Sequence, residues 1–496
     1  MVKPGRPVTI VLPCFRRATS IELDTCFLPI KLPPAGELPA LEMLSISGNI
    51  VDLGAFLNRC PRLRVLRVTF RGVKPGTLEL AIAALQAAAA LGLVVSRIGI
   101  KFDYIDGRQN IDGACFASLL GAVATLSPLE FFFENGFREW TEADMLCFPH
   151  TTSIEMNLYR LRFKQLPAGE FSALERLSLS GCTLVNLVTM VSRCPRLRVL
   201  KVIADKFARD VTIHSASLQE LQICVTERSW CRRIDIRTPL LKQLNLNVHG
   251  NTALTVSIMA PLLEQVSWRW EYAELPLMFG FWSLRMMKLV TAESNNGKDG
   301  VLNNDTQDAC SPHPHINVLS LHVVHASYRL GAAMNFVAEI EKIPVTNFSV
   351  LELHISQRGH VYGPFLLRLF GMHHIRTAIR SLKVILPWHE ISGIQGCLEN
   401  FPCDEPTNWR SQNISLDNLA EVEIDNFRGG DRGTDFLTLI FKWAPMLKRM
   451  TVRISPQIEQ DKFKACAMDT HNIFSVYHSV NCSLFIQHTS IPSPCS

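Results

Sequence analysis

Histidine and cysteine are the residues of this chain whose types could support metal binding or nucleophilic chemistry. Two close histidine pairs occur, His313 with His315 and His373 with His374, but no third ligand recurs at the spacing of metal sites. The sequence shows neither a glycine-rich phosphate loop nor the motif of an exposed nucleophilic serine. We therefore predict no catalytic residue, no metal site and no cofactor, and expect that the protein is not an enzyme.

Two cysteines stand in an identical context, because the string CPRLRVL begins at Cys60 and again at Cys194. Paired metal ligands would need a Cys-x-x-Cys or histidine partner nearby, and neither string has one. We expect both cysteines to pack as small apolar side chains at the end of a helix. The chain has 15 cysteines, an odd number, and its N-terminal apolar run is too short for a signal peptide, so we expect reduced thiols in the cytoplasm or nucleus.

The two identical strings belong to a longer duplication. CFRRATSIEL at Cys14 aligns with CFPHTTSIEM at Cys147, and LPALEMLSISG at Leu38 aligns with FSALERLSLSG at Phe171. The first part of the chain is therefore a copy of the part that follows it, which indicates a repeat architecture.

A shorter pattern, apolar-x-x-apolar-x-apolar, recurs within and beyond the duplication. Its fourth positions lie 21 to 23 residues apart between Ile154 and Val266, within the period of leucine-rich repeats, about 20–29 residues. The hexads begin at Ala18, Leu41, Leu63, Val95, Leu126, Thr151, Leu174, Leu197, Leu218, Leu241, Leu263, Leu284, Ile316, Phe348, Ile379, Leu419 and Leu447.

Each hexad ends in a short strand, so the fourth and sixth side chains should enter the core and the third, fifth and seventh should face the other way. Stacked units predict an α/β leucine-rich-repeat solenoid, a curved parallel sheet with helices and extended segments on its convex side. Helical spacing of apolar residues favours helices over 52–60, 114–126, 184–194, 335–343 and 435–444. Residues 80–96 are expected to be a buried helix running into a strand rather than a membrane span, and the links between Leu200 and Met287 to be extended or single turns.

The outward-facing hexad positions predict a mixed polar concave surface that suits a protein or peptide partner. They are Met43, Ser45, Ser47, Val65, Arg67, Thr69, Arg176, Ser178, Ser180, Val199, Lys201, Ile203, Glu220, Gln222, Gln243, Asn245, Asn247, Gln265, Ser267 and Arg269. We expect Gln243, Asn245, Gln265 and Arg269 to form part of the partner site. The alternative is that these four residues only keep the sheet soluble. His322 and His354 also fall at outward-facing positions and are expected to face solvent.

Other segments carry simpler expectations. Residues 291–315 are polar and predict a surface loop, and residues 395–413 a second loop that Trp409 could pin to the core. Adjacent repeats should place Glu421, Glu423 and Asp425 opposite Arg449, Thr451 and Arg453. The formal net charge of +5 and the arginines of the CPRLRVL strand are too weak a signal for nucleic acid, so we expect neither nucleic-acid nor membrane binding.

Several strings resemble plant, especially grass-type, F-box proteins with leucine-rich repeats and a C-terminal FBD-like region. They are FPCDEPTNWRSQ from Phe401, ISLDNLAEVEIDNF from Ile414, LERLSLSGC from Leu174, and FASLLGAVATLSPLEFFFENGF from Phe116. The resemblance implies residues 1–133 as a first leucine-rich-repeat segment, 134–396 as a second with loop 291–315, and 397–496 as FBD-like C-terminal repeats and tail.

The same resemblance implies the substrate-recognition part of a cullin–RING ubiquitin ligase receptor, with a protein target on the concave face. Residues 1–32 lack the leucine-proline-aspartate start and the arginine-tryptophan pair of an F-box. We therefore expect no F-box in this chain, and binding to the cullin–RING adaptor only if an F-box lies upstream. An F-box-less scaffold or decoy, or a small-molecule-sensing repeat protein, is the alternative role.

Overall fold

The computed structural model divides the chain into two compact units, which are described separately. The first comprises residues 1–249 and 254–264, and the second comprises residues 250–253 and 265–496. The structure describes residues 10–11, 13, 15–31, 36–50, 53–71, 76–103, 113–135, 141–164, 169–184, 187–207, 210–225, 231–272, 277–279, 282–293, 315–325, 348–356, 362–386 and 407–486.

In the first unit, most strands pair in parallel with the strand of the next repeat. The strands are β1 (Ile10–Val11), β2 (Ser20–Lys31), β3 (Met43–Ile50), β4 (Val65–Phe70), β5 (Arg97–Phe102), β6 (Glu130–Asn135), β7 (Thr141–Ala143), β8 (Ser153–Phe163), β9 (Arg176–Leu184), β10 (Val199–Phe207), β12 (Glu220–Val225) and the start of β14 (Gln243–Met259). β2 pairs with β3, β3 with β4, β4 with β5, β5 with β6, and β6 with β8, and the series continues through β9, β10 and β12 to β14.

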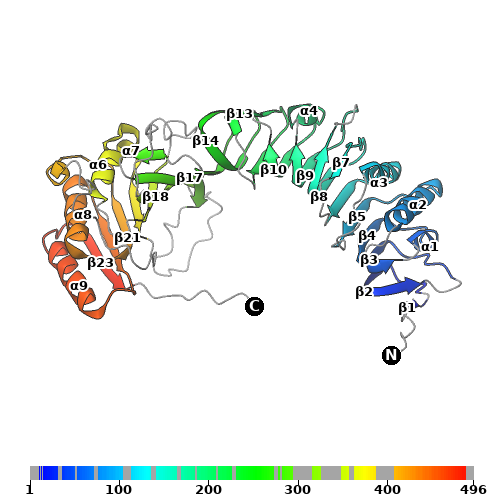
Figure 1. The fold of residues 1–496 in the computed structure, drawn as a ribbon, viewed down its shortest axis with the longest axis horizontal. Coiled ribbons are helices and arrows are strands. Elements are labelled where there is room, and N and C mark those ends of the chain that lie inside the picture. Colours follow the sequence, from blue (N-terminus) through cyan, green and yellow to red (C-terminus); the bar gives the residue numbers. More distant parts are fainter. Residues whose placement is uncertain are drawn as a thin grey trace, which may run out of the picture. The chain divides into compact units, whose positions relative to one another are not determined.

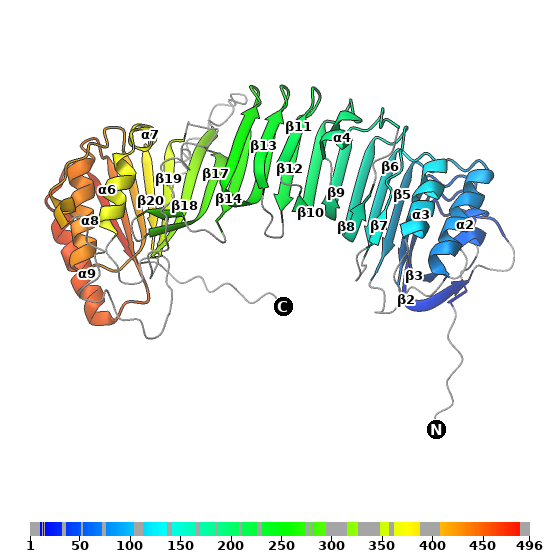
Figure 2. The ribbon, with the colours of Figure 1, turned by 45° about the horizontal axis from the view of Figure 1, so that its top comes forward.

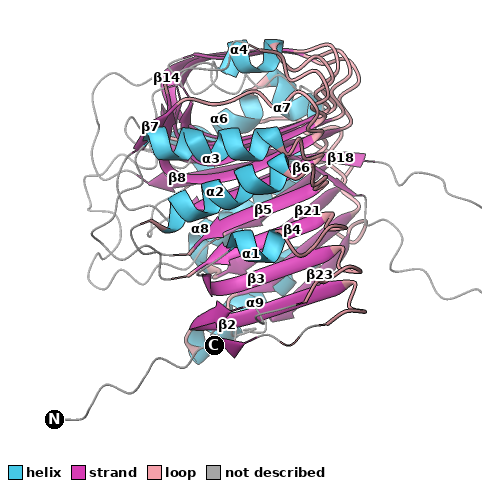
Figure 3. Ribbon diagram, turned by 90° about the vertical axis from the view of Figure 1, so that its right-hand side faces the viewer, coloured by secondary structure: helices cyan, strands magenta, loops and turns pink. Residues whose placement is uncertain are grey.

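Helices cover one face of this sheet. α1 (Leu53–Leu57), α2 (Thr77–Ala90) and α3 (Gly113–Thr125) lie side by side over β3–β6, as Figures 2 and 3 show, and α4 (Leu187–Ser192) follows β9. The other face, which carries the third, fifth and seventh hexad positions and no described helix, is called the open face. Apolar side chains fill the space between sheet and helices, where the rings of Phe116 and Phe133 lie 5.1 Å apart.

In the second unit, strands and helices again alternate, but the first strands form hairpins. The elements are β15 (Gln265–Glu271), β16 (Leu277–Phe279), β17 (Trp282–Glu293), β18 (His315–His325), β19 (Val350–Ser356), α6 (Gly363–Gly371), α7 (His373–Ala378), β20 (Ser381–Ile385), η1 (Thr407–Arg410), β21 (Glu421–Phe427), α8 (Gly430–Trp443), β22 (Arg449–Ile454), α9 (Gln460–Phe474) and β23 (Asn481–Ile486). From β18 to β23 each strand pairs in parallel with the next (Figure 1).

The hexads correctly predict the buried positions of almost every strand. The fourth and sixth residues of the duplicated CPRLRVL repeats, Leu66 and Val68 in one copy and Leu200 and Val202 in the other, are buried. The copies also fold alike, because β2, β3, α1 and β4 have the counterparts β8, β9, α4 and β10. The sheet is mostly parallel, and the chain has an α/β repeat fold.

The expectation of a wholly parallel sheet is wrong at β17. This strand runs antiparallel to β15, β16 and β18. The link from Phe279 to Trp282 is too short for the crossover that a parallel pair requires, so the chain turns back on itself.

The hexad beginning at Leu126 is also wrong in register. Its fourth residue, Leu129, is 51% exposed, whereas Phe131 and Phe133 are buried. Ser127 adopts a left-handed conformation with φ of 48° just after α3, and the turn there takes up two extra residues before the strand begins. The core of this repeat is therefore aromatic rather than leucine-rich.

The expected helices and loops are met in part. α1 and α4 lie within their predicted ranges, whereas α3 begins just before its range, at Gly113, and α8 begins well before its range, at Gly430. Residues 335–343 fall outside the described residues. Residues 80–96 do form a helix leading to a strand, but α2 buries only one face, because Leu80 is exposed. Residues 291–293 extend β17 and His315 begins β18, whereas 294–314 lie outside the described residues. Between Leu200 and Leu244 the links are extended, because β11 (Asp210–His214) and β13 (Cys231–Arg237) form a separate parallel pair.

Candidate partner-binding surface

Cys60 and Cys194 are core residues, as the sequence predicts. Both side chains are buried, and the Cys194 thiol donates a hydrogen bond to the carbonyl oxygen of Met190 at 3.2 Å. Burial raises the pKa of Cys60 to about 11 and that of Cys194 to about 12. A thiol with so high a pKa is a poor nucleophile and a poor metal ligand at neutral pH.

The open face of the first unit is ordered by the strand register into rows that cross the sheet. One row holds Ser45, Arg67, Gly99, Phe132 and Glu155 on β3, β4, β5, β6 and β8. It continues through Ser178, Lys201 and Gln222 to Asn245 on β14. All twenty outward-facing residues expected from the hexads are at least partly exposed, which confirms the assignment of the two faces.

The four predicted partner-site residues are exposed, but they belong to different units. Gln243 and Asn245 lie on β14 in the first unit. Gln265 and Arg269 lie on β15 in the second, where the Arg269 guanidinium pairs with the carboxylate of Glu271 at 2.5 Å. The structure therefore groups Gln243 with Asn245 and Gln265 with Arg269.

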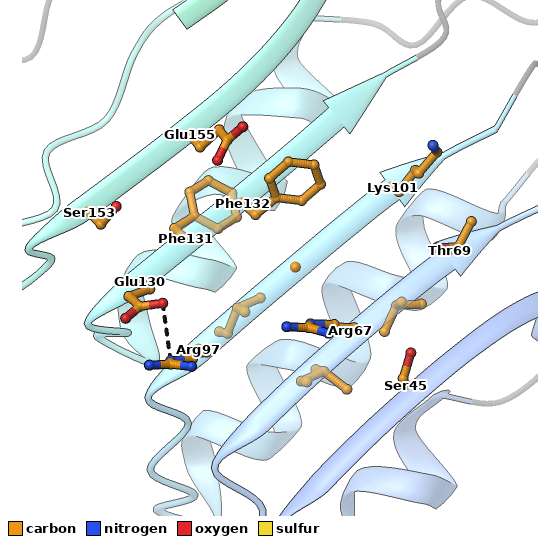
Figure 4. A pocket seen from close by; sticks show the side chains of 14 residues that line it. Ser45, Arg67, Thr69, Arg97, Lys101, Glu130, Phe131, Phe132, Ser153 and Glu155 are labelled. Carbon is orange, nitrogen blue, oxygen red and sulfur yellow. Dashed lines mark ion pairs between the residues drawn. The ribbon is translucent and has the colours of Figure 1, made fainter. Parts of the chain in front are cut away.

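A pocket of about 410 Å³ opens on the same face of the first unit, over β4, β5, β6 and β8 (Figure 4). Its floor is the backbone of Gly99, which has no side chain to fill the row. Arg67 and Phe132 form opposite walls, and Arg97 pairs with Glu130 at 3.1 Å along one end. The hexad alignment missed this pocket, although a glycine at the fifth position of VSRIGI was a visible signal.

A second cluster lies in the second unit, on the side of its sheet that carries the seventh hexad positions, where the strand register sets His322 opposite His354. Their imidazole rings stack with centroids 3.8 Å apart. His354 Nε2 donates to Glu352 Oε1 at 2.5 Å, and Ser320 Oγ donates to the same oxygen at 3.3 Å. Both histidines lie on the outward-facing side of the sheet, as expected, but the stack and the carboxylate leave each of them only partly exposed.

The pKa of His322 is lowered to about 4, mainly by burial of its ring. The neighbouring His354, Arg269 and Lys288 also lower this pKa, and Glu352 raises it. The hydrogen bond from His354 lowers the pKa of Glu352.

His322 should make stability depend on pH in the acid range. Its ring is neutral in both states above an unfolded pKa of about 6.5, whereas between about pH 6.5 and pH 4 only the unfolded state takes up the proton. Stability is therefore lost as the pH falls, by about 1 kcal/mol between pH 7 and pH 5 for this half-buried ring. Urea denaturation of His322→Gln should show a shallower loss than the parent, and His373→Gln, on the exposed surface of α7, should not. Equal slopes in all three proteins would contradict this assignment.

The predicted charge pairing between β21 and β22 is confirmed. Glu421 lies opposite Arg449, Glu423 opposite Thr451 and Asp425 opposite Arg453. Arg449 contacts Glu421 at 2.8 Å, and Arg453 contacts Asp425 at 2.8 Å as well as Glu423.

Reversing the charges of Glu421 and Asp425 to arginine should destabilise the second unit by about 1 kcal/mol, because like charges then meet across the strands. The matching change of Arg449 and Arg453 to glutamate should restore most of that loss. Restoration should be incomplete because Lys383 Nζ lies 3.6 Å from Asp425 Oδ2 and would then face an arginine. Urea denaturation of the three variants measures the coupling, and simple additivity would show that the facing charges do not interact.

Among the described residues, no group of three or more histidine, cysteine, aspartate or glutamate side chains could hold a metal ion. Within the same part of the chain, every helix is too short or too polar to cross a lipid bilayer.

One family model matches the chain, over residues 120–289. It describes the leucine-rich repeats of the FBD-associated F-box protein At5g56370, a plant protein. No curated protein matches the chain. The matched residues run from α3 to β17 and include all four predicted partner-site residues. Over this range the chain is similar to leucine-rich repeats that occur in an F-box protein, which points to a role in protein interaction.

Proposed function

We propose that this chain is a leucine-rich-repeat solenoid that binds a protein target on its open face. The observation that carries the proposal is the register of the first unit, which aligns exposed polar side chains in rows from β3 to β14, while α1, α2 and α3 cover the opposite face over β3–β6. Stacked repeats use such continuous surfaces for binding proteins. The match to repeats of an F-box protein supports the same role.

The finer role is that of the substrate-recognition part of a plant, grass-type F-box receptor of a cullin–RING ligase, with residues 397–496 as the FBD-like region. In that role the repeats select the target and an F-box upstream of them contacts the adaptor. Without an F-box the same repeats act as a scaffold or as a decoy that shields targets. Both roles place the protein in the cytoplasm or nucleus, without enzymatic activity of its own.

The test begins with peptides selected from a random display library against the full chain. Alanine at Gln243, Asn245, Gln265 and Arg269 together should weaken the Kd of a selected peptide at least about fivefold and leave the Tm unchanged, since all four side chains are exposed. The matched control is alanine at Glu79 and Leu80, which are exposed on helix α2. Peptides whose binding is lost in the control and kept in the open-face variant would overturn the proposal.

The link to ubiquitin transfer needs a separate measurement. A pull-down with purified cullin–RING adaptor should succeed for a chain that carries an F-box upstream of these repeats and fail for residues 1–496 alone. Adaptor binding by the repeats themselves would show that the adaptor site is built in a different way from the one proposed.

A further inference from the structure

The pocket over Gly99 presents different chemical groups in a fixed order across the strands, and a partner can match this order. Along one row of the open face, successive strands present a guanidinium at Arg67, bare backbone at Gly99, an aromatic ring at Phe132 and a carboxylate at Glu155. Figure 4 shows Arg67 and Phe132 on the two strands that flank β5, and Glu155 beyond Phe132. The Phe132 ring is half-buried, so it offers apolar area that neighbouring side chains leave uncovered.

Arg67 and Glu155, the two charges at the ends of the part of the row that lines the pocket, differ from the other charges of the pocket. Arg97 is paired with Glu130 at 3.1 Å, and Lys101 is paired with Glu134 at 3.2 Å and with Asp103 at 3.7 Å. Among the described residues, Arg67 and Glu155 have no ion pair and no side-chain hydrogen bond. Both are exposed. The part of the row that lines the pocket therefore has one unpaired positive charge, Arg67, at one end and one unpaired negative charge, Glu155, at the other.

The spacing of the row matches an extended peptide laid across the strands. Neighbouring strands lie about 4.8 Å apart, so Arg67 and Glu155, three steps apart, are separated by about 14 Å at the backbone. In an extended chain, side chains at positions i and i+4 face the same way and are separated by about 13.5 Å, with position i+2 midway. Position i+2 then lies between Gly99 and Phe132, over the floor of the pocket.

We infer that the pocket binds an extended peptide segment with an acidic residue at i, an apolar residue at i+2 and a basic residue at i+4, seated on Arg67, on Gly99 and Phe132, and on Glu155. This inference rests on the proposed function and names the chemistry of the target. Guanidinium and carboxylate form paired hydrogen bonds, and the apolar side chain fills the gap left by Gly99. Charge fixes which end lies over which strand, so the acidic residue lies over β4 and the basic residue over β8.

A blocked peptide with glutamate, leucine and lysine at alternate positions and alanine between them is the first probe. Fluorescence anisotropy should show binding to the full chain, weakened at least about tenfold by Gly99→Val, which places a side chain where the leucine sits. A Cβ at Gly99 meets only ordinary contacts, the nearest being Arg67 Cγ at 3.5 Å, so this variant should fold. Gln222→Val, on the same row but outside the pocket, is the matched control and should bind as the parent does.

A change of specificity is the stricter test, because it requires a gain of binding. Glu155→Arg should prefer a peptide with glutamate at both ends over the original peptide by about tenfold, and Arg67→Glu should prefer lysine at both ends. An unchanged preference in both variants would overturn the inference.

The outcomes also separate this inference from the proposed function. Suppose that library-selected peptides bind the Gly99→Val variant as tightly as the parent and bind the four-residue alanine variant more weakly. That result would overturn the inference and still support the proposed function. Peptides insensitive to every open-face variant would remove both. Binding of free glutamate and lysine as tightly as the peptide would show a small-molecule site and overturn the peptide assignment.

Discussion

Alanine at Gly363 should lower the free energy of unfolding of the second unit by about 3 kcal/mol, through overpacking of a core that cannot yield. Gly363 begins α6 and lies against the side chain of Trp409, which is 1% exposed. A Cβ at this position would overlap ring atoms Cζ3 and Cη2 of Trp409 and approach Cε3 to 2.5 Å. The indole cannot move aside easily, because it is rigid and enclosed.

The control is in the same helix. Gly371 closes α6, and a Cβ there meets nothing within 4 Å, so Gly371→Ala should change stability by less than about 0.5 kcal/mol. In a Trp409→Leu background, Gly363→Ala should cost much less than in the parent, because the smaller side chain leaves room. Urea denaturation of the four proteins gives the coupling energy. A similar cost in both backgrounds would place the strain elsewhere.

Alanine at Phe133 should destabilise the first unit by about 4 kcal/mol, in the range of large-to-small changes at buried aromatic residues. The Phe133 side chain is 0% exposed, and its ring lies 5.1 Å from that of Phe116 on α3 and 6.0 Å from that of Phe102 on β5. Removing the ring opens a cavity between sheet and helix.

Phe132 provides the matched control for Phe133, because it is the same residue type, next in the chain and on the other face. Phe132→Ala should lower the free energy of unfolding, measured by urea denaturation, by much less, about 1 kcal/mol or under, since its ring is partly exposed. Phe132→Ala should instead weaken the binding of the glutamate-leucine-lysine peptide to the pocket. Equal destabilisation by the two variants would show that the faces of β6 are assigned wrongly.

The repeating hexad predicts much of this fold because one apolar pattern fixes both the strand and the face that it buries. Buried and exposed side chains alternate in the same way in parallel and antiparallel strands, so the hexad pattern cannot reveal that β17 runs in the opposite direction. Left-handed backbone at Ser127 is equally hidden, and it moves the core of that repeat from Leu129 to Phe131.

The sequence predicts which face of the sheet carries the candidate site, but it does not predict where on that face the pocket lies. Alternation shows that a residue points outward, whereas a pocket depends on which residues the register brings together from separate strands. Gly99 between Arg67 and Phe132 shows this, because each residue is unremarkable alone. The stacked pair His322 and His354 could have been found, since both stand at the seventh position of consecutive hexads.

The duplication also bears on how the chain finds its fold. β4 begins with VLRV and β10 with VLKV, and both strands follow nearly identical turns. β3 can therefore pair with either strand during folding. Val65 follows Met43 by 22 residues and Val199 follows it by 156. Closing the longer loop costs about 1.7 kcal/mol more in chain entropy. Proximity along the chain, more than strand sequence, therefore selects the native neighbour, and a refolding reaction started from the full-length unfolded chain has a built-in competing topology.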